Sequence, residues 1–184
     1  MKIKITHTFL FLLLSANAII SANAGPHSHE AHEHGVAQLT LAIEGNVLAI
    51  EFESPAANLV GFEHKARTQE EIKQVKQAKD ILNSPEALFS FVGTNCIAQK
   101  TTADVSGVKG DAHNEHKHHD HPKNHSEITA NYLFNCKNSS QLTSLSIALF
   151  EKFNGIKIIN ATWITDTEQR AEKLNAEKKI IFLR

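Results

Sequence analysis

The stretch that decides the fold runs from Val36 to Glu53 and reads VAQLTLAIEGNVLAIEFE. On both sides of Gly45-Asn46, apolar residues alternate with polar ones, which predicts two strands that each bury one face. A glycine and an asparagine between two such runs favour a two-residue turn. The sequence therefore predicts an antiparallel hairpin with strands over residues 36–44 and 47–53, which Ser54-Pro55 ends.

A second pair of strands is predicted over Cys96–Val105 and Glu127–Cys136. If the two cysteines stand opposite each other in an antiparallel ribbon, Val105 falls opposite Glu127 and the register closes without a slip. Opposed residues in such a ribbon have the Cα separation that a disulfide needs. We therefore expect a ribbon that a disulfide can clamp at one end, with a connection over residues 106–126 at the other.

Helical patterns mark three further segments. Thr68 and Glu71 form a capping box ahead of the apolar stripe that runs to Leu82. The sequence also predicts a shorter helix from Ser84 to Phe91 and a second long helix over Ser140–Phe153, whereas residues 156–164 and 179–183 are β-rich. The expected fold class is α+β: a single domain of antiparallel strands and hairpins packed with two main helices, with one long histidine-rich loop.

The first 24 residues are typical of a secretory signal peptide. Two lysines precede the apolar run Phe9–Leu14, and Ala22-Asn23-Ala24 supplies a cleavage site. This run is too short for a membrane anchor, which needs about 20 apolar residues. We expect residues 25–184 to form one exported domain without membrane insertion, in an oxidising compartment where Cys96 and Cys136 pair. Two free buried thiols or two metal ligands are the alternatives for these cysteines.

Histidine is the outlying residue of the composition. The chain has 12 histidines but one Met, one Trp and one Tyr, which points to metal binding. Lys and Arg together number 19 against 20 for Asp and Glu. Nucleic acid is therefore not an expected partner, because the chain has no excess of positive charge.

Two tracts carry most of the histidines. The connection 106–126 holds six of them among acidic residues, and a second cluster occupies residues 27–34. Neutral imidazole and carboxylate are ligands for zinc, and imidazole also suits copper and nickel. The longer tract has almost no apolar residue, so we expect a cation to order it by gathering its ligands. The candidate metal ligands are His27, His29, His32, His34, His64, His113, Glu115, His116, His118, His119, Asp120, His121 and His125.

Other interpretations of these tracts stay open. A histidine-rich tract can be a solvated spacer, or a segment that becomes charged below a pH of about 6.5. A zinc hydrolase is disfavoured, because the segment His29–Glu33 has Glu33 where the His-Glu-x-x-His motif needs its second histidine. The sequence also lacks Gly-x-Ser-x-Gly and Cys-x-x-Cys. We therefore expect a binding protein without catalytic residues.

Several motifs together resemble one known family. They are HEHGVAQL at residues 32–39, EFESPA at 51–56, NLVGFEH at 58–64, Cys96, the histidine-rich insert, YLFNC at 132–136 and LFEKF at 149–153. This combination resembles the zinc-regulated periplasmic zinc-binding proteins of Gram-negative bacteria, the ZrgA-like family. The resemblance implies a periplasmic α+β protein that binds Zn²⁺ through histidine-rich segments and assists an ABC-type zinc importer.

Two functions are expected. In the first, the chain captures zinc ions and passes them to a periplasmic zinc solute-binding protein or to the importer itself. In the second, it is a buffer or detoxifier for zinc, copper or nickel without a transfer step. Zinc is preferred because of the resemblance, and because the chain offers almost no Met and no free Cys ligands for Cu(I).

Overall fold

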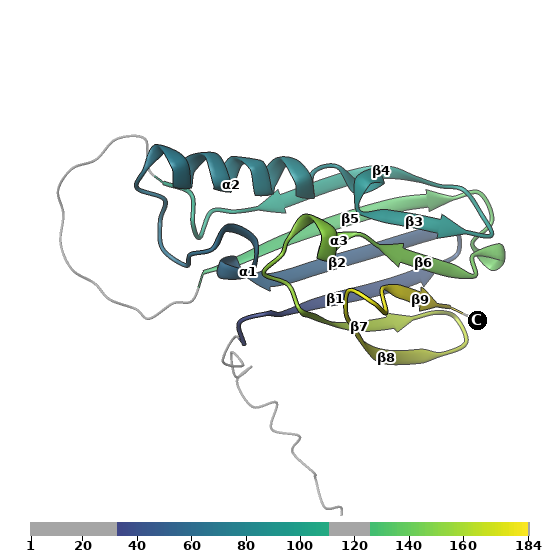
Figure 1. The fold of residues 1–184 in the computed structure, drawn as a ribbon. Helices are drawn as coiled ribbons and strands as arrows, with labels where there is room; N and C mark the ends of the chain where they lie inside the picture. The colour runs from purple at the N-terminus through teal and green to yellow at the C-terminus, as the bar shows by residue number, and fades with distance from the viewer. Residues whose placement is uncertain (1–32, 111–125, 184) are drawn as a thin grey trace, which may run out of the picture. The chain divides into compact units, whose positions relative to one another are not determined.

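The described part of the chain is an α+β structure with two sheets (Figure 1). The computed structural model describes residues 33–110 and 126–183. The chain divides into two compact units, Met1–Glu30 and Ala31–Arg184, and every described residue belongs to the second. The expected α+β class is confirmed, whereas the predicted signal peptide lies outside the described residues.

The larger sheet has the strand order β4-β5-β2-β1-β7-β8, and the smaller one has the order β3-β6-β9. The strands are β1 (Val36–Glu44), β2 (Val47–Pro55), β3 (Phe89–Val92), β4 (Cys96–Asp104), β5 (Glu127–Cys136), β6 (Ser144–Ile147), β7 (Ile158–Ile164), β8 (Gln169–Leu174) and β9 (Ile180–Phe182). The helical segments are α1 (Ala56–Val60), α2 (Gln69–Leu82), α3 (Leu149–Lys152) and the 3₁₀ turns η1 (Pro85–Ala87) and η2 (Ser139–Gln141).

The hairpin predicted around Gly45-Asn46 is confirmed and lies at the centre of the larger sheet. Its strands β1 and β2 pair antiparallel. On the outer side of β2 lies β5, again antiparallel, and on the outer side of β1 lies β7. The β1–β7 pair is parallel, from Val36 opposite Ile158 to Ala42 opposite Ile164. The sequence predicted only antiparallel strands, because a parallel pair joins segments far apart in the chain and has no local signal.

The ribbon of β4 and β5 has the predicted partners at one end only. Cys96 stands opposite Cys136, but the register shifts beyond Ala98, and Asp104 pairs with Thr129. The prediction of a register without a slip is therefore wrong by one residue. Gln99 is the extra residue, a β-bulge in an edge strand.

The alternation of side chains explains why this bulge is needed. Without it, Lys100, Thr102 and Asp104 would share the buried face with Cys96, because side chains alternate strictly along a strand. After the bulge these three residues are exposed, and Ala103 is turned toward the core. The bulge therefore keeps two charged side chains in water.

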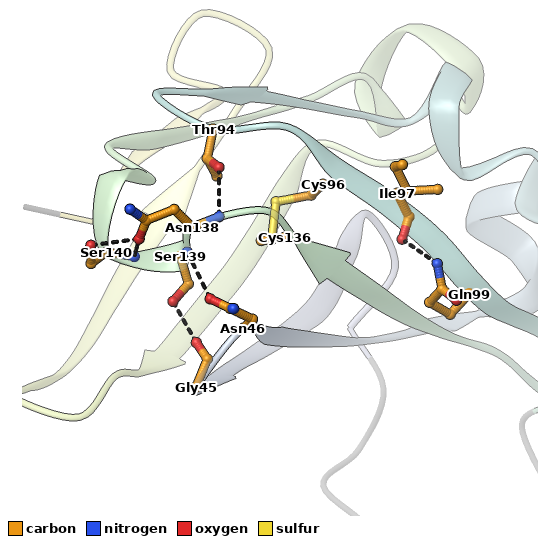
Figure 2. The surroundings of a disulfide bond; sticks show 10 residues. All are labelled: Gly45, Asn46, Thr94, Cys96, Ile97, Gln99, Cys136, Asn138, Ser139 and Ser140. Atoms are coloured by element: carbon orange, nitrogen blue, oxygen red, sulfur yellow. Dashed lines mark hydrogen bonds between the residues drawn. A yellow bond between two sulfur atoms is a disulfide. The ribbon is translucent and has the colours of Figure 1, made fainter.

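The predicted disulfide joins Cys96 to Cys136 at the end of this ribbon (Figure 2). At the same end, the hairpin turn meets the residues that follow β5. The carbonyl oxygen of Asn46 accepts a hydrogen bond from the Cys136 N–H at 2.8 Å, and Asn46 Oδ1 accepts one from the Ser139 N–H at 3.3 Å. The disulfide therefore holds the edge strand β4 to a part of the sheet that is already cross-linked by hydrogen bonds.

The long helix predicted over Ser140–Phe153 does not form, and that prediction is wrong. The segment instead contains η2, β6 and the one-turn helix α3. The helical spacing of its leucines competes with the alternation of Leu145 and Ile147, which are both buried. The strand is favoured because β3 and β9 lie on its two sides and satisfy its backbone hydrogen bonds.

The shorter helix predicted from Ser84 to Phe91 is also wrong beyond its first turn. Only η1 is helical, and Phe89 and Phe91 lie on β3. Their rings contact Tyr132 and Phe134 of β5, with centroids 5.0 and 4.9 Å apart. These aromatic contacts pack the smaller sheet against the inner face of the larger one.

One face of the larger sheet is buried and the other is open to solvent. Along β1 and β2, Leu39, Leu41 and Phe52 are fully buried, whereas Thr40 and Glu51 are exposed. The buried residues of α2 and of the smaller sheet belong to the same hydrophobic cluster. Among the described helices only α2 exceeds five residues, and none is long and apolar enough to cross a membrane.

We expect the Cys96→Ser/Cys136→Ser double variant to lose about 4 kcal/mol of unfolding free energy, because the disulfide closes a loop of about 40 residues in the unfolded chain. Urea unfolding can be followed by the fluorescence of Trp163, the single tryptophan, which is buried. Reductant should lower the midpoint of the parent protein to that of the variant and leave the variant unchanged. Equal midpoints of the oxidised parent and the variant would contradict this expectation.

Candidate metal centre

His34 is held at the entrance of β1 by the backbone that follows it. Gly35 adopts a left-handed conformation, with φ of +89°, that other residues rarely adopt. Its carbonyl oxygen accepts hydrogen bonds from the N–H groups of Lys157 and Ile158, at 2.7 and 2.9 Å. The chain at His34 is thereby fastened to β7 before β1 begins.

Asn58 of α1 supplies the second fastening. Its side-chain oxygen accepts a hydrogen bond from the Gly35 N–H at 2.7 Å, and its amide nitrogen donates to the Val36 carbonyl at 2.9 Å and to Ser54 Oγ at 3.0 Å. Asn58 is buried, so these bonds replace water for both ends of the amide. The amide therefore fixes α1, and the residues that follow it, next to the start of β1.

This arrangement brings His34 beside Glu63. His34 Nε2 lies 3.0 Å from Glu63 Oε1, and the His34 side chain is 67% exposed. The other ring edge of His34 is therefore open to solvent or to a further ligand. The two residues are 29 positions apart, and the Asn58 bonds explain how they meet.

His64, the next residue, points to a different carboxylate. Its Nδ1 lies 2.9 Å from the Lys65 carbonyl oxygen, and because a carbonyl only accepts, Nδ1 carries the proton. The ring stacks on Phe62, with centroids 4.9 Å apart. In the neutral ring Nε2 then carries the lone pair, which is the form that binds zinc. Nε2 lies 3.7 Å from Glu71 Oε1.

Glu71 itself is fixed by the capping box that the sequence predicted. Its Oε2 accepts hydrogen bonds from the N–H groups of Arg67 and Thr68 at 2.7 and 3.0 Å, and Thr68 Oγ1 accepts from the Glu71 N–H at 3.1 Å. The backbone bonds from Arg67 and Thr68 hold the pKa of Glu71 below its ordinary value, and the positive charge of His64, when its ring is protonated, adds to this effect. Glu71 therefore stays ionised and faces His64 with its other oxygen.

The two described ends of the histidine-rich connection both contact the segment of residues 63–66. At one end, the Val108 carbonyl accepts a hydrogen bond from the Ala66 N–H at 2.8 Å, and a side chain at Gly110 would overlap the Ala66 carbonyl. At the other, Ser126 Oγ donates to the Glu63 carbonyl at 2.9 Å. Both ends therefore contact residues that flank His64.

Most of the predicted ligands lie outside the described residues. They are His27, His29, His32, His113, Glu115, His116, His118, His119, Asp120, His121 and His125. Of the predicted set, the structure describes His34 and His64, and it places each beside a glutamate. Within residues 33–110 and 126–183, no group of three or more His, Cys, Asp or Glu residues could hold a metal ion. A tetrahedral zinc ion needs four ligands, so each described pair is at most half a site.

Sequence reasoning missed Glu63, Glu71 and Asn58 as members of this centre. Glu63 had a local signal, since it directly precedes His64. Glu71 was recognised only as a helix cap. Asn58 had no signal of its own, because its role depends on a strand entrance 22 residues away.

The chain has the residues of a metal-binding protein, and a comparison with known families gives its class. A family of zinc uptake proteins matches residues 31–183, nearly the whole chain beyond the predicted signal peptide. It is the ZrgA family of zinc uptake proteins, and the chain belongs to it. The resemblance noted in the sequence is thereby confirmed, and a role connected with zinc follows. No curated protein matches the sequence.

The capping box yields a test of the charge at Glu71. Because the folded pKa of Glu71 is lowered, its ionised form stabilises the fold above a pH of about 4.3, and this contribution is lost as pH falls through the lower folded pKa. Glu71→Gln keeps a capping side chain and removes the charge. We expect the variant to melt below the parent at pH 7, with the gap closing toward pH 3.

Glu70→Gln is the matched control, since Glu70 is exposed on the same turn. It should melt like the parent at both pH values. Identical melting curves for Glu71→Gln and Glu70→Gln at pH 7 would contradict a stabilising charge at Glu71.

Proposed function

We propose that this chain captures zinc in the periplasm through its histidine-rich segments and passes it to an ABC-type importer, directly or through the importer's solute-binding protein. Zinc is the cargo in this scheme. Membership of a zinc uptake family supports the choice of metal and the direction of transport. The disulfide fits an oxidising compartment such as the periplasm.

One observation carries the proposal: three histidine-bearing parts of the sequence start from the same place in the fold. His34 ends the tract over residues 27–34, and the connection 106–126 has its two described ends at Ala66 and Glu63. His64 lies between those two contact points. Ligands on segments that start close together in the fold have a high effective concentration around a shared ion. This raises the affinity for zinc without requiring a rigid, preformed site.

The anchored residues and the tracts contribute differently. His34, His64 and their glutamates stand on backbone that hydrogen bonds hold in place, so little entropy is lost when they bind. We propose that the tract histidines complete the coordination shell and add further, weaker sites. Several weak sites load quickly and release their ions readily, which suits a protein that gives its zinc away.

A buffer or detoxifier without a transfer step is the second candidate. It would use the same ligands, and imidazole sites alone prefer Cu²⁺ to Zn²⁺ in simple competition. The family description as an uptake protein favours transfer. Neither scheme assigns a catalytic residue to the chain.

The test is calorimetric titration of residues 25–184 with Zn²⁺, Cu²⁺ and Ni²⁺. We expect more than one Zn²⁺ per chain. Replacing all six histidines of the connection by Gln keeps its length and should lower the stoichiometry. Apo melting should stay almost unchanged, since a polar tract with almost no apolar residue contributes little burial. His34→Gln/His64→Gln should instead weaken the tightest site. A chelator-stripped chain that binds no zinc at pH 7 would overturn the proposal.

Zinc affinity should also fall steeply between pH 7 and pH 5. Bound imidazole must be neutral, and free histidine becomes protonated around pH 6.5, so protons compete with the metal over this range. Titrations at pH 7.5, 6.5 and 5.5 measure the loss. Unchanged stoichiometry and affinity at pH 5.5 would point to carboxylates, rather than histidines, as the ligands.

A further inference from the structure

A groove of about 310 Å³ lies between α2 and residues 105–110, where the histidine-rich connection begins. Its apolar lining includes Ile72 and Val75 of α2 and Val105, which follows β4. Figure 1 shows α2 lying along β4, which forms this side of the molecule. Ile72, in the first turn of α2, is 43% exposed, although the apolar residues beside it in the groove, Ala66, Val75 and Val105, are buried. An aliphatic side chain on a surface helix is therefore left uncovered.

Lysines surround this apolar floor. Lys76, Lys79 and Lys109 line the groove, and no carboxylate is among its lining residues. Lys76 is paired with Asp80 at 2.6 Å. Lys79 lies close enough to Asp104 to help lower the pKa of that carboxyl, without a salt bridge between them, and Lys109 forms no salt bridge with a carboxylate of the described residues. The groove therefore fits an apolar side chain flanked by negative charge.

The position of the groove connects it with the metal centre. Its lining includes Ala66, two residues after His64, and Gly110, after which the histidine-rich tract begins. A molecule seated in the groove thus contacts residues that stand two positions after His64 and directly before the histidine-rich tract in the sequence. Direct transfer between two proteins requires such a placement, because both must hold the ion in one complex.

The chain's own histidine tracts do not match the groove. Residues 111–125 contain only Ala112 and Pro122 as apolar residues, and residues 25–32 contain only Pro26, Ala31 and a glycine. Neither tract offers an aliphatic side chain large enough to cover Ile72. The fitting occupant is a different protein with an aliphatic anchor and nearby carboxylates.

We propose that this groove, Ile72 and Val75 with the lysines around them, docks the protein that receives zinc from this chain. The receiving protein places an aliphatic side chain against Ile72 and carboxylates against Lys79 and Lys109. This inference rests on the proposed transfer function and specifies where transfer takes place. Buried apolar contact supplies the anchor, and the lysines speed the encounter with an acidic surface.

The experiment measures zinc transfer from the loaded chain to a purified, zinc-free solute-binding subunit of the zinc importer from the same organism. After rapid mixing, the two proteins are separated and the zinc in each is measured. We expect a transfer rate that rises with acceptor concentration and falls with added salt. Ile72→Asp and Lys79→Glu should each lower it at least tenfold, without changing the zinc affinity of the donor, because neither residue belongs to the histidine-rich segments.

Ile164→Asp and Lys173→Glu are the matched controls. Ile164 is 46% exposed, close to the value of Ile72, and both residues lie on β7 and β8 at the far side of the sheet from β4. Both controls should transfer zinc like the parent. Trp163 fluorescence melting shows that each variant is folded, and Lys79→Glu keeps the test valid if Ile72→Asp unfolds.

The outcomes separate the two proposals. A chain that binds no zinc overturns the proposed function itself. A loaded chain whose transfer rate is independent of acceptor concentration, or equal for the groove variants and the parent, overturns the docking site alone. Sedimentation of the donor shows whether a second copy occupies the groove, and a dimer that Ile72→Asp dissociates would also overturn the assignment of the receiving protein.

Discussion

The hydrogen bonds of the buried Asn58 amide are the constraint on which the candidate centre depends. They tie α1 to the first residues of β1, and so give His34 and Glu63 a common place in the fold. A buried amide left without partners costs about 1–3 kcal/mol, so the fold holds this arrangement strongly. Gly155, which precedes β7, lets the chain pass close to Asn58, because a side chain at this position would overlap the Asn58 backbone.

The cross-links that stabilise the fold and the segments that carry the candidate metal ligands lie in different parts of the structure. The disulfide and the hairpin turn cross-link one end of the larger sheet, whereas both described ends of the histidine-rich connection lie near Glu63 and Ala66. The first residues of the connection still belong to the core, because Val108 is fully buried in it. The histidine tract that follows has only Ala112 and Pro122 as apolar residues, so replacing its histidines removes little apolar burial.

Local patterns were enough to predict several elements. The hairpin, the α2 capping box and the cysteine pair each depend on residues that are close in sequence or on a simple register, and all three are confirmed. Predictions failed where two patterns competed within one segment. Leu145 suits a helix with Leu149 and a strand with Ile147, and only the neighbouring strands β3 and β9 favour the strand.

The sequence by itself determined the zinc family and the disulfide partners, because motif spacing and residue chemistry are local properties. It named His34 and His64 only as two of thirteen candidate ligands. Tertiary structure decided that His34 meets Glu63, that Glu71 faces His64, and that Gln99 forms a bulge. These features join segments far apart in the chain. Their energies depend on burial and on backbone hydrogen bonds that exist only once both sheets have formed.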